Sequence, residues 1–312
     1  PGSRARRACL TASLVFTVSA TTANAGETAT FLKIVPGPRP VSMGGAFTGV
    51  ADDLNSLSIN PAGLARMHSR QASFMHAELF EGTRYDFIAF GQPVERGLLA
   101  GGALGFGIQR LGQGKIEGRN ENRQNTGSFE ASDTAYSAAY SRRLGFGGLS
   151  GGAQFKVIES KIADATARTA AVDLGLRKGL STKGLPVSLG AAVRNLGPGL
   201  KFESETNELP TIVSVGAGVR LAGSMMLAAD IAHRPNAQRW TFGFGTEYAL
   251  LPAFSVRGGY ASSTQSGGGH STVLGGLGMG FGIKIHKATI DYSFTPAGEL
   301  GNAQRIAFTA RF

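Results

Sequence analysis

Cysteine is almost absent from this sequence, since Cys9 is the one cysteine among 312 residues. Disulfide frameworks and cysteine-ligated zinc sites are therefore excluded as the basis of the fold. Charged residues amount to only 17% and the mean hydropathy is close to zero, which excludes a highly charged disordered chain. Beyond residue 25 no run of 18 consecutive apolar residues occurs, so we expect no transmembrane helix in that part of the chain.

The first 25 residues have the three parts of an export signal. Three arginines within residues 4–7 precede an apolar run over residues 8–20, and Ala23-Asn24-Ala25 follows. A positive start, an apolar centre and an A-x-A site are typical of a secretory signal peptide. We therefore expect residues 1–25 to be a signal peptide that is cleaved after Ala25, so that Cys9 is lost and the protein is exported.

Glycine is abundant, with 46 residues, about twice its average usage. It disfavours helix interiors by roughly 1 kcal/mol relative to alanine, which argues against a helix bundle. From about residue 71 onward, apolar residues alternate with small or polar ones; residues 273–283, for example, alternate apolar side chains with Gly276, Gly278, Gly280 and Gly282. A period of two indicates β-strands.

The length and number of these segments favour a membrane barrel over a soluble sandwich. A tilted membrane-spanning strand needs about 9 to 11 residues, whereas soluble strands cluster near five or six. We predict an all-β fold over residues 69–312, an antiparallel transmembrane β-barrel of about 14 strands with its apolar face toward lipid and its small or polar face toward the lumen. The expected strands are 70–80, 84–94, 98–110, 130–143, 148–160, 168–179, 186–196, 210–221, 225–234, 238–250, 253–262, 272–284, 287–296 and 303–312.

The segment that precedes the barrel, residues 26–68, does not alternate. It contains Phe31-Leu32-Lys33-Ile34, the stretch Met43-Gly44-Gly45-Ala46-Phe47-Thr48 with Val50-Ala51-Asp52-Asp53 after it, and Asn60-Pro61-Ala62-Gly63-Leu64. These strings resemble the N-terminus of the PorV/PorQ family of outer-membrane barrels, and the Asn-Pro-Ala element is shared with the wider FadL-like group of hydrophobic-compound transporters. The resemblance continues at residues 193–202 and 291–301 and at the terminal Arg311-Phe312.

The resemblance implies that residues 26–68 fold into the lumen as a plug, or hatch. Asp52 and Asp53 suit helix capping, a turn or an ion pair, and adjacent carboxylates sometimes chelate a metal. The plug motif expected from the resemblance comprises Gly44, Gly45, Asp52, Asp53, Asn60, Pro61, Ala62 and Gly63. At the other end of the chain, Phe312 is in phase with the apolar face and resembles the C-terminal aromatic signal recognised by the outer-membrane assembly machinery.

Catalytic and cofactor motifs are not convincing in this sequence, so we expect no enzyme activity, no cofactor and no metal site. Residues 148–152 match G-x-S-x-G, but a strand-like segment follows where a hydrolase needs a helix. The five histidines have no close metal-ligand spacing. A barrel enzyme that assembles distant Ser, His and Asp residues stays open as a third hypothesis.

Basic residues give the chain a net charge of +10, but they are spread along the expected strands and do not interleave with aromatic residues, so we expect no nucleic-acid partner. Pairing inside the lumen with Asp173, Asp230, Glu247 and Asp291 is one interpretation of these cations, and contact with anionic outer-membrane lipid is another.

The resemblance implies an integral outer-membrane protein of the type IX secretion pathway, which binds exported cargo proteins and secretion-system components and aids surface attachment. Its external loops, expected at 111–129, 161–168, 201–209 and 263–271, would make the protein contacts. The alternative is a FadL-like channel that carries long-chain fatty acids or other hydrophobic compounds as ligands inside the barrel.

Overall fold

The structure is a computed structural model that describes residues 27–79, 82–119, 124–145, 147–202, 205–221, 223–265, 276–296 and 301–312. The predicted signal peptide lies outside this range. Four short helices precede the sheet: the 3-10 helix η1 (Thr30–Lys33), α1 (Pro38–Ser42), α2 (Ser56–Ile59) and the 3-10 helix η2 (Pro61–Arg66). In the described part of the chain, none of the helices has the length and apolar character to cross a membrane.

Fourteen antiparallel strands close into a barrel, as the sequence predicted. Neighbours along the chain pair with each other, and β1 pairs with β16 from Gln71↔Arg311 to Glu78↔Gln304, which leaves the barrel without a free edge. The barrel strands are β1 (Gln71–Glu78), β2 (Arg84–Val94), β3 (Gly102–Arg119), β4 (Asn125–Arg143), β5 (Leu149–Ile162), β6 (Ala165–Thr182), β7 (Leu185–Leu196), β10 (Ile212–Leu221), β11 (Met225–Arg234), β12 (Arg239–Leu251), β13 (Phe254–Gln265), β14 (Leu277–Ile285), β15 (Ala288–Pro296) and β16 (Asn302–Arg311).

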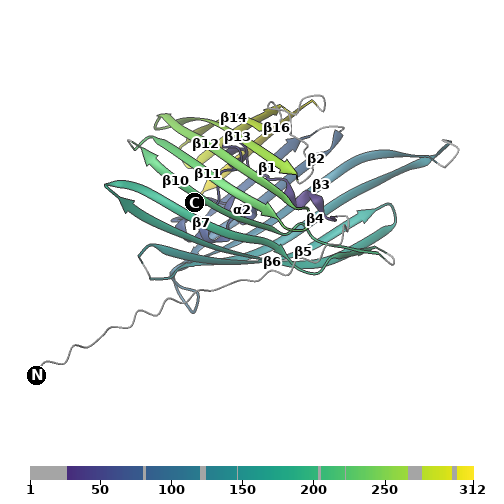
Figure 1. The fold of residues 1–312 in the computed structure, drawn as a ribbon, viewed down its shortest axis with the longest axis horizontal. Coiled ribbons are helices and arrows are strands. Elements are labelled where there is room, and N and C mark those ends of the chain that lie inside the picture. The colour runs from purple at the N-terminus through teal and green to yellow at the C-terminus, as the bar shows by residue number, and fades with distance from the viewer. Residues whose placement is uncertain are drawn as a thin grey trace, which may run out of the picture.

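Two of the expected loops are mostly strand. Strands β3 and β4 pair as far as Arg119↔Asn125, so the prediction of a loop over 111–129 is wrong for most of its length. This hairpin reaches beyond the rest of the barrel in Figure 1. The predicted loop 161–168 shrinks to a turn at Ala163 and Asp164 between β5 and β6. Both errors have one cause. Where a hairpin extends beyond the outward apolar band of the barrel, backbone hydrogen bonds alone hold it together, and its side chains need not alternate. Its polar sequence therefore resembles that of a loop.

A third expected loop contains a small hairpin of its own. Strands β8 (Leu200–Phe202) and β9 (Glu205–Asn207) pair with each other in the connection between β7 and β10, apart from the barrel sheet. The expected loop 263–271 begins in β13, and its remainder lies outside the described residues.

The two faces of the barrel wall differ as predicted. In β16, Ile306 and Phe308 are half exposed on the outer face, whereas Arg305 and Ala307 are buried on the inner face. The same alternation runs round the barrel, so an apolar band faces outward and small or polar residues face inward.

The N-terminal segment, residues 27–68, lies inside this closed wall, where Figure 1 places α2. Its atoms contact inward-facing positions on opposite sides of the barrel, among them Gly105 on β3, Gly152 on β5, Gly216 on β10 and Gly278 on β14. A segment that contacts strands on all sides of a closed barrel must occupy its lumen. Glycine at these wall positions lets the two backbones approach closely.

Candidate functional site

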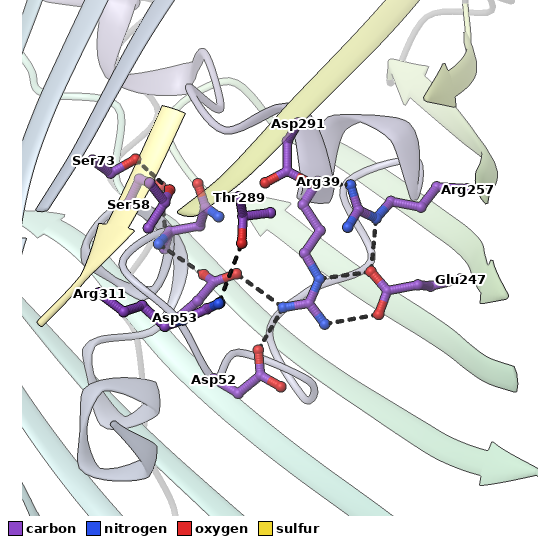
Figure 2. Close-up of polar contacts among 12 residues, drawn as sticks. Arg39, Asp52, Asp53, Ser58, Ser73, Glu247, Arg257, Thr289, Asp291 and Arg311 are labelled. Atoms are coloured by element: carbon purple, nitrogen blue, oxygen red, sulfur yellow. Dashed lines mark hydrogen bonds and ion pairs between the residues drawn. The ribbon is translucent and has the colours of Figure 1, made fainter. Parts of the chain in front are cut away.

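A buried arginine attaches the N-terminal segment to strand β12 of the barrel wall. Arg39, on α1, donates from Nη1 to Asp52 at 2.5 Å and to Asp53 at 2.9 Å. Its Nε and Nη2 donate to the two oxygens of Glu247 on β12, at 2.8 and 3.1 Å. Figure 2 shows the guanidinium between the aspartates of its own segment and the glutamate of the wall. This fork contact gives both charge and direction to the attachment.

The same cluster extends along the wall to two more residues. Arg257 on β13 donates to Glu247 at 2.7 Å and to Asp291 on β15 at 2.6 Å. The prediction that Glu247 and Asp291 pair with basic residues in the lumen is thereby confirmed. Two guanidiniums thus face four carboxylates in a part of the lumen where each of these side chains is at least two-thirds buried.

Burial and charge act in opposite directions on the titration of this cluster. Burial alone would lower the pKa of Arg39, but the charges of Asp52, Glu247 and Asp53 outweigh it and raise that pKa above its ordinary value. Burial raises the pKa of Asp53; Arg39 opposes this shift and Asp52 adds to it. Arg39 therefore stays charged, while Asp53 is the carboxyl of its segment whose ionised form is disfavoured by burial.

Asn60 is the second anchor of the segment. Its Nδ2 donates to the carbonyls of Thr48 at 2.9 Å and Leu176, on β6, at 3.0 Å, while its Oδ1 accepts from the N–H of Ala62 at 3.1 Å. Pro61 pushes Asn60 into the extended conformation that an N-cap adopts, and the side chain caps η2. All polar atoms of the Asn60 amide are thus satisfied in a fully buried position.

Gly44 and Gly45 allow the chain to turn beside β13. Both have positive φ angles, +61° and +75°, and a Cβ on Gly44 would lie 2.5 Å from the carbonyl oxygen of Tyr260. Only glycine meets both demands at Gly44. Farther along the segment, Gly63 has no space for a larger side chain, because a Cβ there would collide with the Ser56 hydroxyl.

Asp230 on β11 holds the turn that follows these glycines. Its Oδ2 accepts from the backbone N–H groups of Phe47 at 3.0 Å and Thr48 at 2.7 Å. The predicted ion pair of Asp230 with a lysine or arginine is not formed at bonding distance among the described residues; the charge of Arg194, which lines the same cavity, acts on Asp230 from farther away. The carboxylate instead accepts hydrogen bonds from two buried backbone N–H groups that have no strand partner.

A separate buried ion pair fixes the wall near the β7–β10 connection. Lys156 on β5 lies 2.6 Å from Asp173 on β6, with both side chains almost fully buried, which confirms the predicted pairing of Asp173. Asp173 also accepts from the backbone N–H of Asn195 at 2.7 Å, and the Asn195 side chain donates to the carbonyl of Pro210 at 3.0 Å. The pair therefore ties the two ends of this connection together.

The lumen is apolar on its opposite side. Leu54, Leu57, Leu64 and Met67 of the N-terminal segment belong to one buried cluster with inward side chains of the first strands. The wall residues of this cluster include Met75, Tyr85, Phe87 and Ile158. A cavity of about 210 Å³ remains between the segment and β7, β10, β11 and β12, lined by Lys33, Arg194, Asp230 and Arg234 among others.

The predicted plug-motif residues therefore fall in three places on one segment: Gly44 and Gly45 at the turn near β13, Asp52 and Asp53 on Arg39, and Asn60 to Gly63 against β5 and β6. Phe312 lies apart from them, two-thirds exposed, with its N–H on the carbonyl of Arg70 at 2.9 Å. Sequence reasoning missed Arg39 as the centre of the cluster. The signal was present, because Arg39 is an isolated charge in a proline-rich stretch that precedes an Asp-Asp pair.

The sequence motifs for catalysis do not acquire catalytic geometry. Residues 149–152 of the G-x-S-x-G match already belong to strand β5, so the match lacks the helix that a nucleophile elbow requires. His76 pairs with Asp86 at 2.7 Å on neighbouring strands. Within the described ranges, no group of three or more histidines, cysteines or carboxylates is arranged to hold a metal ion.

Comparison with known proteins identifies a family and a fold. The profile of the family described as "Uncharacterised protein family (UPF0164)" matches residues 8–251. No curated protein matches the chain. Solved structures with a similar fold include the Ralstonia pickettii toluene transporter TbuX, at 15% identity and a TM-score of 0.63, with 88% of this chain and 98% of that chain covered.

Two further structures have a comparable likeness. A mutant of the TodX monoaromatic hydrocarbon channel has 12% identity and a TM-score of 0.62, covering 88% of this chain and 98% of that one. A Pseudomonas aeruginosa FadL homologue has 10% identity and a TM-score of 0.55, covering 89% and 99%. The chain thus shares the barrel fold of these three proteins.

Proposed function

This chain belongs to the UPF0164 family, and we propose that it is an integral outer-membrane channel that carries small hydrophobic compounds, with residues 27–68 as its plug. The observation that carries the proposal is the N-terminal segment inside a closed 14-strand barrel, in a fold similar to that of a toluene transporter and a monoaromatic hydrocarbon channel.

The attachment of the segment suits a plug that moves without leaving the barrel. Arg39 and Asn60 provide directional polar anchors at two places, and the leucines between them pack against the apolar side of the lumen. These directional bonds hold the segment in one orientation, so a movement of the plug would require their exchange for bonds to water or to a ligand.

A groove on the outer wall supports an apolar ligand. It has a volume of about 710 Å³ and crosses β10 to β13, where Ala217, Ala229 and Gly258 leave a depression between larger outward residues such as Phe244 and Tyr260. Its lining is almost entirely apolar, which suits a hydrocarbon or an acyl chain.

The wall behind this groove is only one backbone thick. Inward-facing Gly245 and Gly259 lie directly against the backbone of Met43. A compound in the groove would therefore be separated from the N-terminal segment by the sheet alone.

Uptake measurements test the proposal. Cells that lack the protein, and cells that express it, are supplied with labelled toluene or with a labelled long-chain fatty acid. Expression should raise uptake of at least one of them. Gly258→Phe should lower uptake several-fold by filling the groove, because a side chain at Gly258 enters open space and spares the fold. Val157→Phe, on the outer face of β5, is the matched control. Equal uptake with and without the protein would contradict the channel proposal.

The type IX role implied by the family resemblance stays a prediction. It requires that a secreted cargo domain or a secretion component co-purify with the protein in mild detergent. Detection of such a partner by mass spectrometry, together with unchanged hydrocarbon uptake, would favour that role over the channel.

A further inference from the structure

One rim of the barrel is basic. The barrel has a rim that carries the start of β1 and the end of β16, called here the Phe312 rim, and a rim at the opposite end. The exposed charged side chains in or near the turns of the Phe312 rim are almost all cations, with Glu95 as the one exposed carboxylate in the described part of this rim. The cations are Arg66, Arg70, Arg96, Arg142, Arg143, Lys178, Lys183, Lys284 and Lys287.

The opposite rim has charges of both signs. Its exposed side chains include Glu78, Arg84, Asp164, Arg168 and Glu208. The positive potential of the chain is therefore concentrated at one end, where it attracts anions from solution.

A cavity opens at the Phe312 rim among three arginines. It has a volume of about 360 Å³ and is lined by Arg66 at the end of η2, by Arg177 on β6 and by Arg220 on β10. The register of the sheet turns Arg177 and Arg220 toward the lumen, because their partners Gly190 and Met226 face inward. Three guanidiniums thus come together from three separate elements at the mouth of the barrel.

Counter-charge in this cavity is insufficient. Asp52 is the one carboxylate of its lining, and Asp52 already accepts from Arg39. Arg177 lies within electrostatic range of Asp52 and Arg66, and its Nε is buried with no hydrogen-bond partner in the described part of the chain. An unsatisfied buried guanidinium N–H costs free energy, which an anion in the cavity would recover.

We propose that this cavity binds a phosphate group through Arg66, Arg177 and Arg220. Three cations against one shared carboxylate leave about two positive charges uncompensated, which favours a phosphate dianion over a singly charged carboxylate. Guanidinium forks also match the tetrahedral array of phosphate oxygens. The phosphate can belong to a free ion or to a lipid headgroup, and the basic rim would concentrate either one at the mouth.

Binding to purified protein in detergent tests the site without any transport measurement, so the site and the channel can fail separately. Inorganic phosphate and a short-chain phosphatidic acid in mixed micelles are titrated by calorimetry at constant ionic strength, with chloride as the competing anion. We expect saturable binding of at least one of the two probes. Binding of both assigns the site to phosphate in general, and binding of the lipid alone assigns it to a headgroup.

Variants distinguish specific binding in the cavity from general electrostatic attraction of anions to the basic rim. Arg177→Gln and Arg220→Gln should each weaken binding at least tenfold, whereas Arg143→Gln removes the same charge from the exposed rim outside the cavity and should change it less than twofold. Arg66→Gln should also weaken binding. Because Arg66 is exposed, we expect this replacement to leave the fold intact. An equal loss in Arg143→Gln, or the absence of saturable binding of both probes to the wild-type protein, would overturn the proposal.

Discussion

Replacement of Arg39 by methionine should release the N-terminal segment while the barrel stays closed. The side chain makes two contacts to Glu247 and one each to Asp52 and Asp53. Removing one partner of a buried ion pair costs about 3 to 5 kcal/mol, because the other charge is left uncompensated. Glu247 keeps Arg257, and the two aspartates are partly exposed, so the lower end of that range, about 3 kcal/mol, applies.

Three kilocalories per mole correspond to an increase of roughly a hundredfold in the population of the released segment, at about 1.4 kcal/mol for each factor of ten. Limited proteolysis of the detergent-solubilised protein measures this population, since cleavage within residues 27–68 requires release. The barrel itself should keep its heat-dependent mobility on gels, because the strand pairing does not depend on Arg39. In planar bilayers, the variant should also open more often than the wild-type protein.

Two variants decide whether the reasoning is correct. Arg168→Met breaks the ion pair of Arg168 with Glu159, which at 2.6 Å is about as short as the contacts of Arg39. The Arg168 side chain is 71% exposed, so loss of this pair should lower stability by less than about 1 kcal/mol. Adding Asp52→Asn and Asp53→Asn to Arg39→Met should restore much of the protection, because the stranded charges are removed. Equal cleavage of the Arg39 and Arg168 variants would refute the argument.

Three further perturbations have defined outcomes. Burial raises the pKa of Asp53, so the segment in its place in the lumen should gain protection from proteolysis as the pH falls through that raised pKa. Asp53→Asn should remove this pH dependence. A pH profile of the variant identical to that of the wild type would contradict this prediction. Gly175→Ala places a Cβ against Asn60 and should lower the free energy that holds the segment in the lumen by about 1 to 3 kcal/mol. In Gly179→Ala, on the same face of β6, the Cβ enters open space, so this control should be neutral. Limited proteolysis measures both. Asp230→Ala leaves two buried N–H groups unpaired and should cost about 1 to 3 kcal/mol per group. Hydrogen exchange at Phe47 and Thr48 should therefore become faster, and exchange no faster than in the wild type would contradict this prediction.

The likeness to solved structures bears on the fold of this chain. TbuX and TodX are described as a toluene transporter and a monoaromatic hydrocarbon channel. Their identity to this chain is 15% or less, so the shared barrel leaves the choice between channel and cargo binding to the uptake and co-purification experiments.

The alternation of apolar and small residues, read along the chain, determined the fold class and the strand number. Strands β2 (Arg84–Val94) and β11 (Met225–Arg234) have the predicted bounds, because an outward apolar band imposes a period of two wherever a strand faces lipid. The polar ends of β3 and β4 lie outside that band. There the sequence has no such constraint, so only the backbone pairing shows that the strands continue.

Local chemistry could also be predicted where neighbouring residues produce it. The cap of Asn60 on η2 follows from Asn-Pro in the sequence, and the adjacent Gly44 and Gly45 are a local signal for a backbone with positive φ. The meeting of Arg39 with Glu247 joins residues 208 positions apart, and the gathering of Arg66, Arg177 and Arg220 joins three elements. Closure of the barrel decides such meetings, since it fixes which strand faces which part of the enclosed segment, and no period in the sequence encodes that distance.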